Sequence, residues 1–328
     1  SAKSDAAAQT LSVVSRHDGA WADALRGLAL TAYTQTTGVP ARLDVWTGGL
    51  DALRTGLKGG WDVVQLTAQE LADACQEGLV EKLDWAAIGG RDHYVQGAAN
   101  DCGVGAGAHA LLLSWDRDKV KGAPTWADFF DIARYPGKRA LPKRARGVLE
   151  IALLADGVAP GDVYRTLRST DGTDRAFRKL DQLRPYLDWW QTGREATRIL
   201  GSGAVLMVAA PNARVLAANA SEGRHFGAQW TGAVVSMDWW AIARDTPRGQ
   251  QAQQLLYLLG LPALEGRLLE RTGIAGFAKG SADLLPAAAQ ANSPLLPANL
   301  SGALVADEGF WHDNGERLDG KFAAWLAH

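Results

Sequence analysis

Three short segments carry side chains that could bind or transform a ligand. These are His17-Asp18, Trp46-Thr47 and Asp238-Trp239. A carboxylate beside an aromatic face suits an organic cation, because the negative charge and the ring quadrupole both attract positive charge. His17 and Asp18 could form an acid–base pair, but neighbours on an extended segment point to opposite faces. We therefore expect one residue of this pair to face a ligand and Asp18 to cap a helix N-terminus.

Signatures of catalytic and cofactor sites are missing from the sequence. The stretch GVGAGA at 103–108 fits a dinucleotide-binding pattern, but it precedes an apolar strand instead of following one and opening a helix. No phosphate-binding loop, nucleophile elbow or H-E-x-x-H motif occurs, and the six His are scattered. We therefore expect no catalytic residue, no metal and no cofactor.

Strand and helix patterns alternate along the first eighty residues. A β-branched run at 10–16, a period-2 alternation at 41–47 and a nearly continuous apolar run at 61–66 indicate strands, and helical stripes separate them. Gly38 is expected to end one helix, and Thr67 with Glu70 forms a capping box at the start of another. This order predicts a mostly parallel sheet, in which ligands bind beyond the carboxyl ends of the strands. Arg16, Trp46 and Thr67 lie at those ends.

Composition describes a chain of 328 residues with 34 basic and 36 acidic side chains, and therefore a formal net charge of −2. This balance argues against nucleic acid as a partner, and the length suggests two domains. The longest apolar stretches are too short to cross a bilayer. The chain begins Ser1-Ala2-Lys3-Ser4 without an apolar signal core, which fits a processed product.

The two cysteines, Cys75 and Cys102, are 27 positions apart (102 − 75) and have no His at metal-ligand spacing. They could be buried free thiols, as in a cytosolic protein. They could equally be paired, and composition alone does not decide between these alternatives.

Many blocks, spread in order over nearly the whole chain, resemble one protein family. They include WDVV, ADACQEGLVEKLDW, NDCGVGAGAHALLLSWD, PTWADFFDIARYPGKRAL, LEIALLADGVAPGDVYRTL and EGFWHDNGERL. These blocks resemble bacterial periplasmic solute-binding proteins of the spermidine/putrescine type, which serve ABC importers. The resemblance implies a two-lobed α/β fold of the type II periplasmic-binding class, with a hinge between the lobes. It also implies a small-molecule ligand, a membrane permease as partner and a monomer. In the oxidising periplasm, it favours a Cys75–Cys102 disulfide.

The resemblance divides the chain into two lobes. Lobe one is expected to hold residues 1–108 and 239–283, and lobe two residues 113–234 and 288–328. The chain is expected to cross between them near 108–113, 234–239 and 283–288.

Ligand identity follows less directly from the resemblance. Polyamine binders hold amines with carboxylates and aromatic rings, and Asp238 lies where one such acid belongs. Asn212 matches a family Asn-Gly-Arg stretch, although Pro211 and Ala213 depart from that pattern. The run PKRAR at 142–146 is basic where polyamine binders place acids. We expect a polyamine or another small organic amine, with this ligand set: Arg16, His17, Asp18, Trp46, Thr67, Asn212, Asp238 and Trp239.

Two other ligand or function classes remain open from the sequence. One is a receptor for a small organic anion or amino acid, held by Arg16, Arg144 or Arg214. The other is a secreted enzyme on the same fold, with His17 or Asp238 as base. A receptor that also acts as a sensor cannot be distinguished from sequence.

Overall fold

The computed structural model describes residues 9–328, which form two compact units. Unit 1 contains residues up to Ala108 and Met237–Ser293, and unit 2 contains His109–Ser236 and Pro294–His328. The chain passes between the units inside two long strands, β4 (Val104–Asp116) and β8 (Phe226–Ile242), and again after Ser293. None of the described helices is both long and apolar enough to cross a membrane.

The last crossing lies later in the chain than the 283–288 expected from the sequence. The segment after α13 (Pro262–Thr272) packs back onto that helix, and α14 (Ala287–Gln290) contacts it. Gly266 allows this approach, because a Cβ there would lie 2.5 Å from the Ser281 carbonyl oxygen. Residues 281–293 therefore stay with unit 1.

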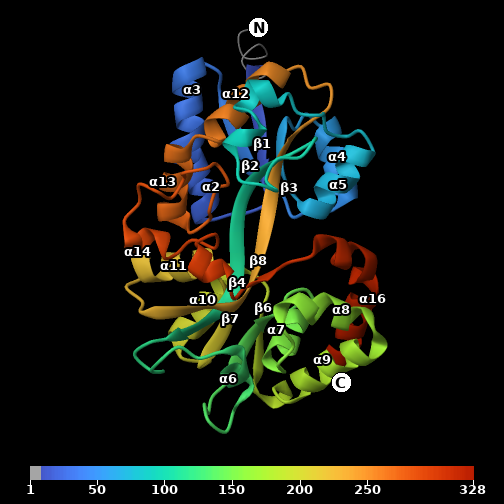
Figure 1. Ribbon diagram of the computed structural model, residues 1–328, viewed down its shortest axis with the longest axis vertical. Coiled ribbons are helices and arrows are strands. Elements are labelled where there is room, and N and C mark those ends of the chain that lie inside the picture. The colour runs from blue at the N-terminus through green and yellow to red at the C-terminus, as the bar shows by residue number, and fades with distance from the viewer. Residues whose placement is uncertain (1–8) are drawn as a thin grey trace. The chain divides into compact units, whose positions relative to one another are not determined.

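Unit 1 is a sheet with helices on both faces. Its strand order is β2-β1-β3-β8, with β1 parallel to β2 and β3, and β8 antiparallel to β3. In Figure 1, α4 and α5 lie on one side of this sheet, and α2, α3 and α13 lie on the other. Its elements, besides parts of β4 and β8, are β1 Leu11–Ser15, α2 Ala20–Ala24, the π-helical turn Leu25–Leu30, α3 Thr31–Thr37, β2 Ala41–Val45, α4 Leu50–Lys58, β3 Val63–Thr67, α5 Ala68–Gln76, the 3₁₀ turns Trp85–Ile88 and Arg91–His93, α12 Gly249–Leu259, α13 and α14.

The local signals in unit 1 match the sequence prediction. All five residues of β1 are buried, as expected for a central strand covered on both faces. Gly38 ends α3 with a φ of 73°, and the side chains of Thr67 and Glu70 form the predicted capping box of α5. Gly38 sets the end of α3, and Thr67 with Glu70 sets the start of α5 directly after β3. These boundaries determine where the residues at the strand ends lie.

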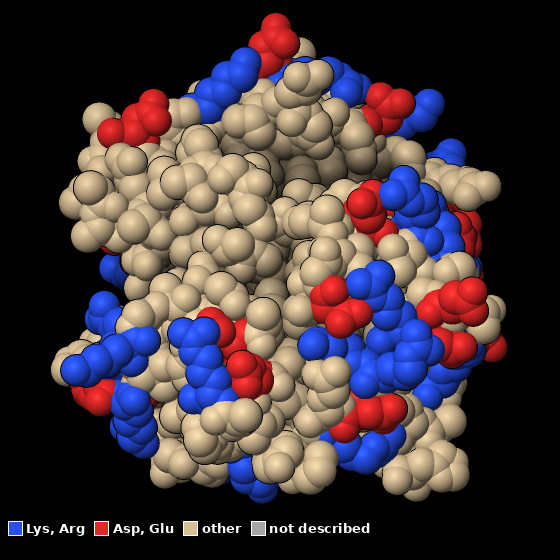
Figure 2. All heavy atoms as spheres, turned by 60° about the horizontal axis from the view of Figure 1, so that its bottom comes forward, with Lys and Arg blue, Asp and Glu red and all other residues tan. Residues whose placement is uncertain are grey.

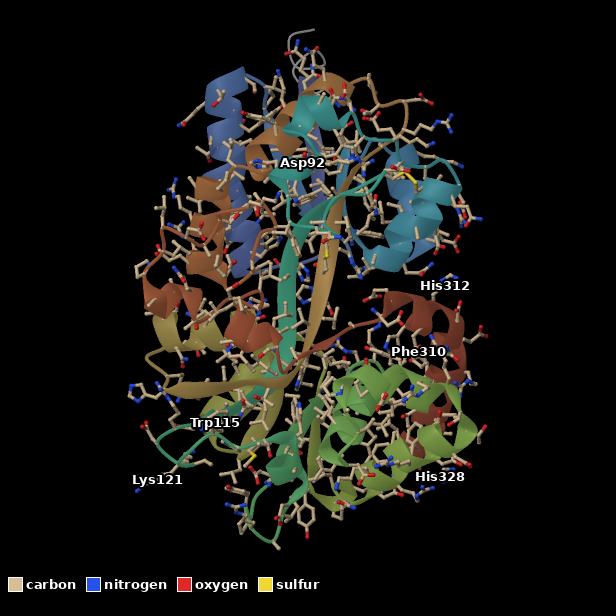
Figure 3. The ribbon with its side chains drawn as sticks, in the orientation of Figure 1. Asp92, Trp115, Lys121, Phe310, His312 and His328 are labelled. Atoms are coloured by element: carbon tan, nitrogen blue, oxygen red, sulfur yellow. A yellow bond between two sulfur atoms is a disulfide. The ribbon has the colours of Figure 1, made fainter. Side chains whose placement is uncertain are left out.

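The cysteines form the disulfide that the family resemblance favoured. Cys75 on α5 is bonded to Cys102, just before β4, and the Cα atoms are 5.9 Å apart (Figure 3). By constraining the unfolded chain over 27 residues, such a bridge stabilises the fold by about 3.5 kcal/mol. The disulfide therefore ties a surface helix to the strand that leaves the unit.

Unit 2 has the strand order β4-β7-β5-β6, and β9 pairs with β8. β5 is parallel to β6 and β7, whereas β4 is antiparallel to β7. Its elements, besides parts of β4 and β8, are α6 Trp126–Phe130, β5 Arg139–Pro142, α7 Val148–Ala155, the 3₁₀ turn Pro160–Asp162, α8 Val163–Arg168, α9 Thr170–Asp181, the 3₁₀ turn Arg184–Tyr186, β6 Leu187–Trp190, α10 Gly193–Ser202, β7 Met207–Pro211, α11 Asn212–Ser221, α15 Pro297–Leu300, β9 Leu304–Val305 and α16 Glu308–Leu326.

A fully buried arginine, Arg139, holds the loop that precedes β5. The Arg139 guanidinium donates to the backbone carbonyls of Phe129 at 2.7 Å, Tyr135 at 2.8 Å and Gly137 at 2.9 Å. Burial lowers the pKa of Arg139 to about 10, so the side chain is still charged at neutral pH. These bonds fix the loop before β5, and β5 leads directly to the basic run at 142–146.

A buried glutamate in unit 1 should make stability depend on pH. Glu265 on α13 accepts hydrogen bonds from the Ala278 N–H at 3.2 and 3.3 Å, and its carboxyl lies where a Gly276 Cβ would be. Burial raises the pKa of Glu265 from 4.5 to about 8, against the opposing effect of these hydrogen bonds. Between those two values the unfolded chain binds fewer protons than the folded one, so the free energy of unfolding falls as pH rises.

We expect Glu265→Gln to remove this contribution, which amounts to a slope of up to about 1.4 kcal/mol per pH unit. Urea unfolding of both proteins at several pH values between 5 and 8 measures it. Glu270→Gln, an exposed position on the same helix, is the control. Equal pH slopes for wild type and Glu265→Gln would contradict the assignment.

Candidate functional site

In unit 1, two of the predicted ligand residues meet at the strand ends. Asp238 on β8 is only 4% exposed and lies opposite Thr67, the last residue of β3. His17 follows β1, and its Nε2 forms an ion pair with Asp238 Oδ2. Gln65 fixes the end of β1, because its Oε1 accepts from the Ser15 hydroxyl at 2.8 Å and the Arg16 N–H at 3.0 Å. The sheet thus places a carboxylate and an imidazole together at its edge.

Arg16 and Trp46 are engaged with each other and with the core. The Arg16 guanidinium lies 5.2 Å from the Trp46 ring centroid, and its Nε is 3.6 Å from Glu70 Oε1. Trp46 is 6% exposed, and its Nε1 donates to the Gln65 carbonyl at 3.0 Å. Trp46 therefore acts mainly as a core residue, and Arg16 already has an anionic partner.

Asp18 does not cap the helix as predicted. The N-cap of α2 is Gly19, whose φ of 67° suits glycine, and no side chain caps this helix. Asp18 instead accepts from the adjacent Gly19 N–H at 2.7 Å and is exposed. The predicted cap is wrong by one residue. Asp is a preferred N-cap residue, but Gly19 occupies the N-cap position of α2. Asp18 is left facing solvent beside His17.

Trp239 and Asn212 make contacts that support the fold. Trp239 is 7% exposed and belongs to the apolar cluster that packs under α4 and α5, with Leu53 and Leu71. Asn212 lies in unit 2, where it begins α11 and its Oδ1 accepts from the Ala110 N–H at 2.9 Å. It therefore holds β4 against the helix and does not share unit 1 with Asp238.

Unit 2 has a pocket of its own, with a cavity volume of about 90 Å³. The basic run supplies two arginines to its lining, and β4 supplies a histidine. The full lining is His109, Ala110, Leu111, Arg144, Arg146, Gly147, Glu150, Pro211, Val234, Ser236 and Ala306. This volume lies below the range of about 300–1,000 Å³ that is typical of complete small-molecule sites.

The two arginines of this pocket differ in their partners. Arg146 forms an ion pair with Glu308 at the start of α16, at 2.7 Å. Arg144 is exposed, donates to the Arg146 carbonyl at 3.1 Å and lies 5.8 Å from the Trp190 ring. Within residues 9–328, no carboxylate forms an ion pair with Arg144. Arg144 is thus available to an anion, whereas Arg214 packs beside Gly193 on α10 and does not line the pocket.

Glu150 and α16 were not predicted from the sequence to contribute to this site. Glu150 is completely buried, and its Oε1 accepts from the Gly147 N–H at 2.9 Å, the arrangement of a capping box for α7. The Glu three residues after Gly147 was the signal that could have identified Glu150 as a capping side chain, although Gly147 has no side chain to complete a capping box. No local pattern indicated that Trp311 on α16, 161 positions further along the chain, would donate a hydrogen bond to Glu150. The first turns of α16 carry Phe310 and His312 (Figure 3).

The surface charge is mixed. On the face shown in Figure 2, basic and acidic side chains lie interspersed and form no large area of a single sign. This agrees with the small net charge and gives no support to a polyanionic partner.

Comparisons with known proteins agree with this architecture. Residues 29–298 match the family model of the bacterial extracellular solute-binding proteins. A γ-aminobutyric acid (GABA)-binding protein of Pseudomonas aeruginosa is 39% identical over 271 residues, which cover 82% of this chain and 77% of that protein.

Solved structures show the same fold. An ABC transporter substrate-binding protein from Bradyrhizobium japonicum USDA 110 aligns with a TM-score of 0.85 and 25% identity, over 97% of this chain and 99% of that one. A GABA receptor aligns with a TM-score of 0.83 and 26% identity, over 97% of each chain. The predicted two-lobed periplasmic-binding fold is confirmed, and the chain belongs to the bacterial extracellular solute-binding proteins.

Proposed function

We propose that this substrate-binding receptor of an ABC transporter captures a small zwitterion, an ω-amino acid of the GABA type. The observation that supports this most directly is the opposite charge of the two sites. Unit 1 presents the buried Asp238 carboxylate at its strand ends, and unit 2 presents the Arg144 guanidinium in a pocket. An ω-amino acid carries one group of each complementary kind, an ammonium for a carboxylate and a carboxylate for a guanidinium.

The relatives support the same ligand class. The Pseudomonas aeruginosa protein and the solved receptor are both named for GABA. A polyamine such as spermidine or putrescine, which the family resemblance suggested, suits Asp238 equally well. Neither of its ends, however, carries the negative charge that suits the Arg144 guanidinium. We therefore place polyamines second among the ligands.

The compartment follows from the same proposal. A periplasmic receptor functions in an oxidising environment, and the Cys75–Cys102 disulfide fits that address. The bound molecule is passed unchanged to a membrane permease, which distinguishes a receptor from an enzyme on the same fold.

GABA and putrescine test the proposal directly. Both have four carbons and an ammonium at one end, and the other end is a carboxylate in GABA and a second ammonium in putrescine. We expect isothermal titration at neutral pH to show GABA binding at least about 100-fold tighter than putrescine, because an anion replaces a cation beside Arg144. Arg144→Ala should remove most of this preference. The control Arg198→Ala changes a position on α10 outside the pocket. Tighter binding of putrescine would restore the polyamine assignment.

A further inference from the structure

The charged side chains that line the unit 2 pocket affect how strongly it binds an anion. Its lining carries two cations, Arg144 and Arg146, and one acid, Glu150. Glu308 neutralises Arg146 through their ion pair. The net charge of the lining then depends on Arg144 and Glu150. If Glu150 is ionised, these two charges cancel and an entering carboxylate meets no net positive charge.

Glu150 is held only by uncharged donors. Besides the Gly147 N–H on Oε1, its Oε2 accepts from the Tyr164 hydroxyl and from Trp311 Nε1, both at 3.0 Å. The donors come from the loop before α7, from α8 and from α16, and no cation among residues 9–328 is bonded to the carboxyl. Burial raises the pKa of Glu150, and the hydrogen bonds from Trp311, Tyr164 and Gly147 oppose that shift. A completely buried carboxylate without an ion pair readily gains a proton when a second negative charge approaches.

We propose that Glu150 takes up a proton when the carboxylate of the ligand enters the pocket, so that affinity for carboxylate-bearing ligands falls as pH rises. The inference rests on the proposed function of the pocket. The proton comes from solvent, and one carboxylate is neutralised as another is bound, so the pocket gains no net charge. Tyr164 can accommodate the change, because its hydroxyl accepts a hydrogen bond as well as donating one.

Other ionisable groups surround the same space. His109 lines the pocket and would also favour an anion when protonated, which gives the same direction of pH dependence. Desolvation and the neighbouring Arg146 lower the pKa of Arg144. Asp307 and Glu308 are the acids at the start of α16. Because His109 and Glu150 act in the same direction, the experiment has to separate them.

Proton uptake is measured by isothermal titration at pH 6, 7 and 8 in buffers of different ionisation enthalpy. GABA is compared with 4-aminobutanamide, which keeps the ammonium but replaces the carboxylate by a neutral amide. Both groups of GABA stay ionised over this range. We expect GABA to take up a larger fraction of a proton than the amide, and its affinity to fall by up to about tenfold per pH unit. The amide corrects for protons exchanged at Asp238 and His17.

Three variants assign the proton. His109→Gln should retain the extra uptake, Glu150→Gln should abolish it, and Glu316→Gln, an exposed acid on α16, should leave it unchanged. The His109→Gln measurement keeps Glu150 intact, so it decides the matter even if Glu150→Gln does not fold. Loss of the extra uptake in His109→Gln, or equal uptake for GABA and the amide, would overturn the inference alone. Failure of the wild-type protein to bind GABA would overturn the proposed function together with it.

Discussion

Replacing Asp238 by Ala is expected to weaken binding of GABA by about 30-fold to several thousand-fold. The carboxylate is 4% exposed, so an ammonium bonded to it would interact with a largely desolvated anion that it shares with His17. Losing one partner of a buried, charge-assisted hydrogen bond costs about 2–5 kcal/mol, which corresponds to that range of affinity.

Titration of the Asp238→Ala and Asp238→Asn variants with GABA measures the effect. The Asn variant keeps the shape of the side chain and removes only its charge, so it should also bind weakly. Asp44→Ala, an exposed acid on β2 whose partner is Arg42, is the matched control. Unchanged affinity in both Asp238 variants would show that the ammonium is bound elsewhere.

Replacing Arg248 by Met is expected to lower the free energy of unfolding by about 3–5 kcal/mol. Arg248 donates from Nε to the Asp62 carboxylate at 2.7 Å, and Asp62 is 1% exposed. Asp62 also accepts from the Ser12 N–H at 2.8 Å and the Thr246 hydroxyl at 2.5 Å, so it joins β1 to the loop after β8. Without the guanidinium, a buried carboxylate is left without its counter-charge, and that loss is costly.

Chemical unfolding of the variant, compared with Arg244→Met, tests this expectation. Arg244 is on the same loop, but its side chain is 62% exposed and its ion pair with Asp245 lies at the surface. Such surface pairs contribute between 0 and about 1 kcal/mol. Equal losses in the two variants would contradict a special role for the buried pair. The double replacement Arg248→Met with Asp62→Asn should recover part of the stability, because it removes the orphaned charge.

Local signals indicated many element boundaries correctly, because these boundaries depend on residues that are neighbours along the chain. Gly38 ends α3, and Thr67 with Glu70 starts α5, for reasons that need no tertiary contact. The alternation of strands and helices likewise indicated the α/β fold. The cap at Asp18 failed because Asp and Gly are both plausible N-caps, and only the backbone conformation of Gly19 decided between them.

What each predicted ligand residue contacts was decided by the tertiary structure. Sequence placed Trp46 and Trp239 at strand ends, but whether a ring faces a ligand or the core depends on packing, and both rings are buried. The pairing of His17 with Asp238 joins residues 221 positions apart, and that of Glu150 with Trp311 joins residues 161 apart. The sequence by itself determined the fold, the strand-end acid and the basic run at 142–146. Only the folded chain selected Arg144 over Arg16 and Arg214 as the accessible cation, because long-range contacts engage Arg16 with Glu70 and leave Arg214 outside the pocket.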